Sequence, residues 1–319
     1  MTPIPDQQLP AIQIETVPED RRSEALQLFF HHNLPTTRKL LVEQWLAANA
    51  SGEVPLDGLI WALVQGRPVG VGFYSRHPGS TAFVWKPMAD PSCLVLPSDP
   101  STEEIQIALL REIGHRLDAE NVRIGQILSR PEPSERELFT AGGFRWTTDL
   151  HYLLHSLKPT SSSEVSPDWV RTAYDHHNSE SVRLFADVLE RTWQATQDCP
   201  ELNGLRTGAE ALEGHREGVE CDKLFWSLFI VENKPIGLCL LNPRDNDIWE
   251  LVYVGVVPEA RGHQFGQAMI RHALDAAREH RQSGVVLAVD SRNDVARRIY
   301  HDIGFTEIDR LAVYLRLRH

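Results

Sequence analysis

The chain has 319 residues, of which 42% are hydrophobic and 24% are charged, and its formal net charge at pH 7 is −12. This length is typical of two domains, and the hydrophobic fraction is sufficient to give each of them a packed core. A strongly acidic chain is a poor partner for nucleic acid and for anionic membranes, so both partner classes are disfavoured.

The cysteine usage indicates a reducing compartment. None of the four cysteines has metal-ligand spacing, and all are expected to be free thiols: Cys93, Cys199, Cys221 and Cys239. The first residues lack the basic and apolar regions of a secretory signal, and no apolar run approaches membrane-spanning length. We therefore expect a cytoplasmic protein, whose oligomeric state the sequence does not indicate.

The first half of the chain alternates short apolar strands with helical patterns. Residues 1–11 are rich in proline and glutamine and are expected to form a loose arm. The patterns predict strands at 12–17, 59–64, 69–74, 81–86, 93–96, 122–128 and 150–154, and helices at 20–33, 37–48, 102–118 and 133–141.

A serine-rich stretch at 158–168 reads as a linker, and a second unit is expected from residue 169 onward. Its predicted strands are 224–232, 236–241, 249–257, 285–289 and 311–317, and its predicted helices begin at 179, 209, about 266 and about 293. The predicted domains are therefore 1–157 and 169–319.

Two segments of the first half recur in the second half in the same order. Residues 64–70 resemble residues 231–237, and residues 129–144 resemble residues 291–305, with both members of the second pair ending in Gly-Phe. This order indicates an internal duplication. The alternative is chance similarity between common strand–turn patterns.

The junction between the strand at 249–257 and the following helix is a candidate phosphate site. Pro258 ends the strand, and Gly262 and Gly266 would let the backbone approach a ligand closely. The N-terminus of a helix offers unpaired N–H groups and a partial positive charge to an anion. Gly255, inside the strand, indicates either a bulge or a close backbone approach.

A second motif follows the strand at 285–289. Ala296, Tyr300 and Ile303 recur at helical spacing after Asn293, and Gly304 is expected to end the helix. Asn293 at the start of this helix is a candidate N-cap.

The two motifs resemble the signatures of the GNAT acetyltransferase superfamily. Its phosphate loop reads (Gln/Arg)-x-x-Gly-x-(Gly/Ala), which Arg261 and Gly266 match and from which Gln264 departs, because the family has Gly there. Its second signature, Asn-x-x-Ala-x-x-x-Tyr-x-x-x-Gly-Phe, is complete from Asn293 to Phe305. Two motifs in the right order are much more specific than one glycine-rich turn.

The resemblance implies an α+β fold of two tandem GNAT-like domains, each a mixed, mostly antiparallel sheet flanked by helices. The expected domains are a degenerate N-terminal one at 1–157 and an acetyl-CoA-binding one at 169–319, joined by the linker 158–168. This layout is similar to that of mycothiol synthase, itself a tandem-GNAT enzyme, although nothing in the first half identifies a sugar-thiol site.

The resemblance also implies an N-acetyltransferase that moves an acetyl group from acetyl-CoA to the amine of a small molecule or peptide, without a metal. The residues implied to hold the donor are Val254, Gly255, Val256, Arg261, Gly262, His263, Gln264, Phe265, Gly266, Asn293 and Ala296. Two alternatives stay open: a non-catalytic regulator that binds acyl-CoA, and an enzyme with a longer acyl donor or an unusual acceptor. The acceptor pocket is expected in the poorly patterned residues 192–220.

Two side chains are candidates for proton transfer. Glu250 lies among apolar strand residues, where a carboxylate must be paired or line a cleft, and its position resembles that of the glutamate base in several GNAT enzymes. The alternative is a structural Glu paired with an Arg or the backbone. Tyr300 is the candidate acid that protonates the departing thiolate; the alternative is a core aromatic.

Histidines add little to the predicted site. His263 lies in the phosphate turn, where contact with a phosphate and a solvated loop position are both open. The pairs at 31–32 and 176–177 lack a ligand partner at suitable spacing and are expected on the surface.

The first half lacks the residues that carry this chemistry. No glycine and no basic residue occurs from Cys93 to Ile105, and acidic residues occupy the region of the phosphate loop. Acidic side chains near a helix start interact favourably with the positive end of the helix dipole, and they would repel a pyrophosphate. Phe139 stands where the second half has Tyr300. The first domain is therefore expected to bind no acetyl-CoA.

Overall fold

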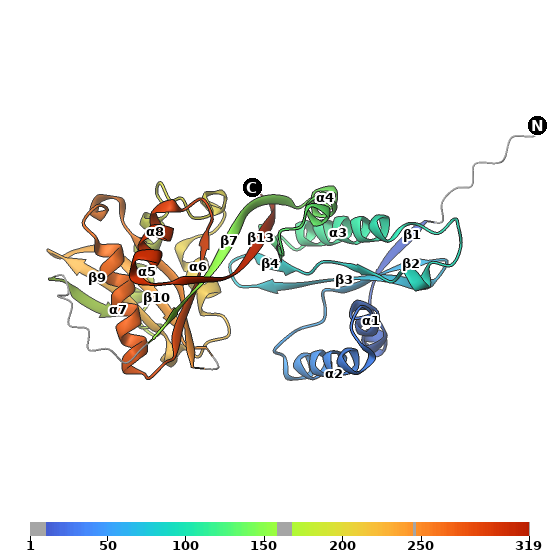
Figure 1. The fold of residues 1–319 in the computed structure, drawn as a ribbon, viewed down its shortest axis with the longest axis horizontal. Coiled ribbons are helices and arrows are strands. Elements are labelled where there is room, and N and C mark those ends of the chain that lie inside the picture. The colour runs from blue at the N-terminus through green and yellow to red at the C-terminus, as the bar shows by residue number, and fades with distance from the viewer. Residues whose placement is uncertain (1–10, 158–167, 245–246, 319) are drawn as a thin grey trace, which may run out of the picture. The chain divides into compact units, whose positions relative to one another are not determined.

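The structure, a computed structural model, describes residues 11–157, 168–244 and 247–318. The chain divides into two compact units (Figure 1), one of residues 1–147 with 313–319 and the other of residues 148–312. Most of the predicted N-terminal arm and nearly all of the predicted linker lie outside the described residues.

Unit 1 contains a sheet with helices at its crossovers. Its elements are β1 (Ile12–Thr16), α1 (Arg22–Phe29), α2 (Pro35–Ser51), β2 (Leu59–Val64), β3 (Arg67–His77), β4 (Thr81–Val84), β5 (Met88–Ala89), α3 (Thr102–Ala119), β6 (Ile124–Ser129), α4 (Pro133–Ala141) and parts of β7 (Arg145–Ser156) and β13 (Thr306–Leu317). Strands β1 to β4 pair antiparallel in chain order, and β4 pairs parallel with β6.

Unit 2 repeats this arrangement. Its further elements are β8 (Val170–Ala173), α5 (Ser179–Thr192), α6 (Gly208–Arg216), β9 (Phe225–Val231), β10 (Lys234–Asn242), β11 (Ile248–Val256), α7 (Phe265–Glu279), β12 (Gly284–Asp290) and α8 (Asp294–Ile303). Strands β8 to β11 pair antiparallel in chain order, β11 pairs parallel with β12, and β12 pairs antiparallel with β7. Both units are therefore mixed, mostly antiparallel sheets with helices, which confirms the predicted fold class.

The equivalent hairpins of the two units share one turn geometry. In unit 1, Gln65 and Gly66 both have positive φ, and in unit 2 the same holds for Glu232 and Asn233. Two central residues with positive φ are the mark of the tight hairpin turn that suits the twist of paired strands. This agreement, together with the shared strand order, supports the predicted internal duplication.

The division of the chain differs from the predicted domain boundaries. From residue 148 onward β7 belongs to unit 2, where it pairs with β12, and the end of β13 from Val313 onward belongs to unit 1. Unit 1 therefore includes a segment from the C-terminal end of the chain, whereas unit 2 is one continuous stretch that begins within β7. Periodicity predicts a strand but does not tell which distant strand it pairs with.

The strand predicted at 93–96 is wrong. Residues Pro91–Cys93 form a short 3₁₀ helix instead, and the N–H groups of Val95 and Leu96 both donate to Asp99 Oδ2 at 2.9 Å. A side chain that binds nearby backbone groups offers the chain an alternative to a sheet ladder.

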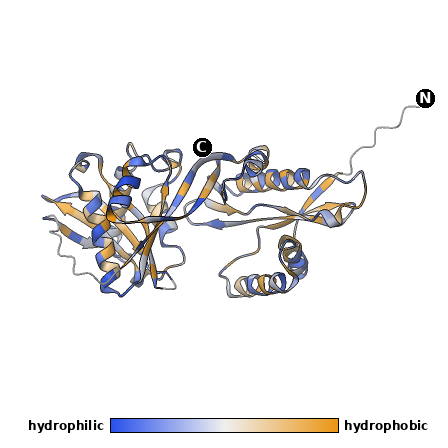
Figure 2. Ribbon diagram, in the orientation of Figure 1, coloured by the Kyte–Doolittle hydropathy of each residue, from blue (hydrophilic) through white to orange (hydrophobic). Residues whose placement is uncertain are grey.

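Apolar residues occupy the strands and the inner faces of the helices, as Figure 2 shows by the orange bands on both. In unit 2 the core joins α5, α7 and the central strands, with Phe185, Leu238 and Met269 fully buried. Within the described residues, no helix has both the length and the apolar character that a membrane span requires.

Candidate active site

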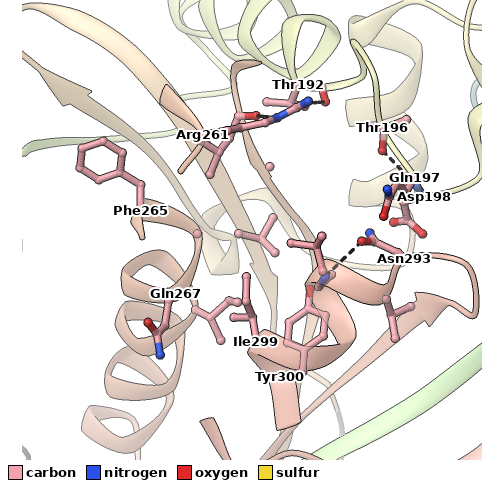
Figure 3. Close-up of a pocket in the computed structure, with 18 of the residues that line it drawn as sticks. Thr192, Thr196, Gln197, Asp198, Arg261, Phe265, Gln267, Asn293, Ile299 and Tyr300 are labelled. Atoms are coloured by element: carbon pink, nitrogen blue, oxygen red, sulfur yellow. Dashed lines mark hydrogen bonds between the residues drawn. The ribbon is translucent and has the colours of Figure 1, made fainter. Parts of the chain in front are cut away.

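A cavity of about 530 Å³ opens in unit 2 at the place where β11 and β12 separate. These two strands pair only from Ile248 to Glu250 on one side and from Gly284 to Val286 on the other. Beyond this point the wall of the cavity is formed by β11, by the loop and first turn of α7, by α8, and by residues 192–198 after α5. Figure 3 shows α7 residues on one side of this cavity and Asp198 and Asn293 on the other.

The loop before α7 has several backbone N–H groups that donate to none of the described residues. Gly262 (φ 84°) and Gln264 (φ 61°) both adopt the left-handed conformation, and α7 starts at Phe265 with no side-chain cap. Among the described residues, nothing accepts a hydrogen bond from the N–H groups of residues 262–267. Such a turn at a helix N-terminus is an anion-binding concavity.

Gln264 stands where the resembled signature has glycine, yet it keeps the backbone conformation that a glycine would adopt there. The position takes a left-handed backbone, which glycine adopts freely and other residues adopt at some cost. The glutamine therefore keeps the geometry that a glycine would give, and it lines the cavity.

Arg261 holds the loop in place through its side chain. Its guanidinium donates to the carbonyl oxygens of Val256 at 3.1 Å and Thr192 at 2.9 Å. These bonds join the loop to the end of β11 and to the end of α5, so the side chain positions the loop at the cavity that Arg261 lines.

Gly255 marks a close approach and not a bulge. A Cβ on this residue would lie 2.8 Å from Thr192 Cβ and 2.8 Å from the Tyr253 ring. The register shift in β11 falls earlier, where Tyr253 and Leu251 face consecutive residues of β10. Of the two possibilities that the sequence left open, the structure therefore shows the close approach.

The second motif brings Tyr300 and Asn293 to the cavity. Tyr300 is only 7% exposed, and its hydroxyl has no hydrogen-bond partner among the described residues. Burial raises the pKa of Tyr300, and the nearby charge of Asp198 raises it further, so the phenol stays protonated at neutral pH. Asn293 caps α8, since its Oδ1 accepts from Ala296 N at 3.1 Å, and both residues line the cavity.

Two predicted site residues do not line the cavity. The Glu250 carboxylate is paired with Arg244, whose Nε lies 2.7 Å from Glu250 Oε2, and this geometry favours the structural alternative for that residue. His263 is exposed, with its ring 6.0 Å from that of Phe265. The other residues predicted to hold the donor all line the cavity.

The structure adds a carboxylate that the sequence analysis missed. Asp198 lies in the loop after α5 and lines the cavity, and its charge acts on both Tyr253 and Tyr300. The loop has no periodic pattern, and its partner Asp290 is 92 residues away in the chain. The one available signal was an acidic residue within the region where the acceptor pocket was expected.

Comparisons with known proteins agree with this geometry. Residues 189–305 match the family model "Acetyltransferase (GNAT) family". A solved GCN5-related N-acetyltransferase from Sphaerobacter thermophilus is 14% identical, with 99% of this chain and 97% of that chain covered and a TM-score of 0.59. A tandem GNAT protein from the clavulanic acid biosynthesis pathway is 13% identical, with 96% and 98% covered and a TM-score of 0.54. No curated protein matches the sequence. At these identities, the solved structures show a shared fold.

Proposed function

We propose that unit 2 transfers an acetyl group from acetyl-CoA to an amine, because residues 189–305 match the GNAT family model and the chain shares the fold of solved GNAT proteins, one of them a tandem GNAT protein. The observation that carries this proposal is the row of N–H groups at residues 262–267, in the wall of a cavity that Tyr300 also lines. Neither these N–H groups nor the Tyr300 hydroxyl forms a hydrogen bond to another described residue. An anion site and a proton donor in one cavity are what a CoA thioester and its departing thiolate require.

The backbone of the α7 loop would bind the pyrophosphate of the donor. Its N–H groups and the positive end of α7 favour negative charge. Asn293 and Ala296 line the cavity at the start of α8, where the pantetheine arm would pass.

Tyr300 would protonate the sulfur when the C–S bond breaks. Its hydroxyl is protonated at neutral pH and is not engaged by any described residue, so it can donate without first losing a hydrogen bond. The amine nitrogen must be neutral when it attacks the carbonyl carbon, because a protonated amine has no free electron pair.

We place this activity in the cytoplasm. The four cysteines are all unpaired, and Cys239 is buried, which fits a compartment where thiols stay reduced.

The test measures both donor binding and turnover with the full chain. Isothermal titration gives the affinity for acetyl-CoA, and release of free CoA thiol is followed with a panel of small amines and amine-bearing peptides. We expect binding and release of CoA with at least one amine. Binding of acetyl-CoA without CoA release for any acceptor would support the non-catalytic regulator instead, and absence of binding would overturn the proposal.

A further inference from the structure

The loop between α5 and α6 places one carboxylate in the wall of the cavity. Asp198 lines the cavity together with its neighbours Thr196 and Gln197, as Figure 3 shows. Its Oδ1 accepts a hydrogen bond from the backbone N–H of Asp290, the last residue of β12, at 3.2 Å. The side chain is therefore oriented by the same strand that forms one side of the opening.

An ion-pair network centred on one buried carboxylate fixes this loop. The fully buried Asp290 accepts from Cys199 N at 3.0 Å and from Thr148 Oγ1 at 2.6 Å. Arg292 binds both Asp290, at 2.7 Å, and Glu201, at 2.6 Å. Arg292 thus neutralises the structural carboxylates on either side of the loop, while no cationic side chain of the described residues forms an ion pair with Asp198.

We propose that Asp198 binds the protonated amine of the acceptor and removes its proton. This inference rests on the proposed acetyl transfer and names the base and the charge of the acceptor for that site. A carboxylate that forms no ion pair with a described residue, in a cavity wall that also holds two tyrosines, attracts a positive ammonium group.

The charges around Asp198 suit a base that works near neutral pH. Crowding by protein atoms raises the pKa of Asp198 to about 6 even though the residue keeps contact with solvent, and the negative Asp290 acts in the same direction. Arg292 and the N–H of Asp290 oppose this rise. Tyr253 of β11, Tyr300 of α8 and Cys199 of the same loop also face the carboxylate, and all three are neutral at pH 7 because burial raises the pKa of each.

Two protons leave the nitrogen during the reaction. The Asp198 carboxylate takes the first from the ammonium, and the nitrogen electron pair then forms the N–C bond to the acetyl carbonyl. The nitrogen of the resulting adduct loses its second proton to water. The C–S bond breaks, and its electron pair remains on sulfur, which takes the proton of Tyr300. Tyr300 regains a proton from solvent and Asp198 releases its proton to solvent, so each turnover releases one proton in total.

The experiment compares Asp198→Asn with Asp187→Asn, an exposed carboxylate on the outer part of α5 that does not line the cavity. CoA release is followed from pH 5 to pH 9 with acetyl-CoA and the amine of the panel that gives the highest turnover. We expect Asp198→Asn to lower kcat/KM by about 10²–10⁴-fold. The variant should also lose the acidic limb of the pH–rate profile near pH 6, while its affinity for acetyl-CoA is retained. Asp187→Asn should keep the parent rate and profile. A parent-like rate and acidic limb in Asp198→Asn would overturn the inference.

A second measurement does not depend on turnover. The carboxyl carbons of ¹³C-labelled aspartate are titrated by NMR in the full chain, and the resonance missing from Asp198→Asn identifies Asp198. A pKa near 6 that falls when saturating n-propylamine is added, in the presence of CoA, supports the inference. A pKa near the ordinary value of about 4, or no response to the amine, contradicts it. If no amine of the panel is acetylated, the proposed function fails while this titration still decides the role of Asp198.

Discussion

The hydroxyl of Tyr253 lies 2.7 Å from the hydroxyl of Thr192, which joins β11 to the end of α5. Thr192 donates its own proton to the carbonyl of Leu189 at 2.6 Å, so Tyr253 must be the donor in this pair. Thr192 also fills the space beside Gly255. One threonine therefore holds the strand that forms the cavity wall, and the absence of a side chain at Gly255 makes this packing possible.

Gly255→Ala should weaken acetyl-CoA binding. The new Cβ would lie 2.8 Å from Thr192 and from Tyr253, so the strand or α5 must move. Such overpacking costs about 1–3 kcal/mol, which is roughly 5- to 150-fold in Kd if all of it falls on the cavity wall. Isothermal titration measures the change.

Gly266→Ala is the matched control for this substitution. Its Cβ would meet nothing closer than Val256 at 3.6 Å, and alanine is favourable in the first turn of a helix. Its affinity should stay near that of the parent. Equal losses in both variants would show that the loop tolerates no side chain at all and that Thr192 is not the cause.

Tyr300→Phe should lower turnover by about 10²–10⁴-fold, the usual range for losing a positioned proton donor. Acetyl-CoA affinity should change little, because the hydroxyl has no hydrogen bond to a described residue and the ring packing on Phe305 is retained. The control is Tyr174→Phe, whose ring packs on Phe185 and Trp226 away from this cavity. An unchanged rate of CoA release at saturating substrates would remove Tyr300 from the mechanism.

Asp198→Asn should stabilise the protein at alkaline pH. The folded state raises the pKa of Asp198 to about 6, so it favours the protonated acid. That favourable contribution is present below the unfolded pKa of about 4 and is lost as the pH rises through 6. A permanently neutral asparagine avoids the loss. The melting temperatures of variant and parent should agree at pH 4 and diverge at pH 8 with the variant higher. A lower melting temperature for the variant at pH 8 would contradict the assigned direction of the shift.

Glu250→Gln distinguishes the predicted base from the one that the geometry favours. The carboxylate is paired with Arg244 and is 31% exposed, so its loss should cost only about 0–1 kcal/mol of stability. We expect the acidic limb of the pH–rate profile to persist. Loss of that limb in Glu250→Gln, with an intact limb in Asp198→Asn, would restore Glu250 as the base.

Several elements were predictable because their local signals are strong. The predicted bounds of β2 and α4 and the predicted start of α5 coincide with those of the structure. In α5, for example, Asn178 caps the first turn, and an apolar face follows at helical spacing. The GNAT loop was predictable for the same reason, since its glycines and the following helix are adjacent in the chain.

Long-range partners were not predictable. The exchange of β7 and the end of β13 between the units depends on pairings between strands more than a hundred residues apart. Asp198 reaches the cavity through Asp290, and Glu250 is neutralised by Arg244, a residue in a loop without a pattern. Local periodicity contains no information on such contacts.

The two units should differ in donor binding, with one acetyl-CoA per chain. The N-terminus of α3 in unit 1 is capped by its own residues, because Ser101 and Glu104 form a reciprocal capping box, and Asp99 binds the N–H groups of Val95 and Leu96 in the loop before the helix. Carboxylates at a helix start interact favourably with the positive end of the helix dipole and would repel a pyrophosphate. A fragment of the first half would lack the end of β13, so the test uses the full chain.

Isothermal titration with acetyl-CoA should give a stoichiometry near one. Gly262→Val should remove all heat of binding, because Gly262 has a φ of 84° and any side chain there strains the loop. Gly52→Val places the same strain at φ 81°, at the end of α2 in unit 1, and should keep the stoichiometry. A stoichiometry near two, or residual binding in Gly262→Val, would mean that a site outside the α7 loop binds the donor.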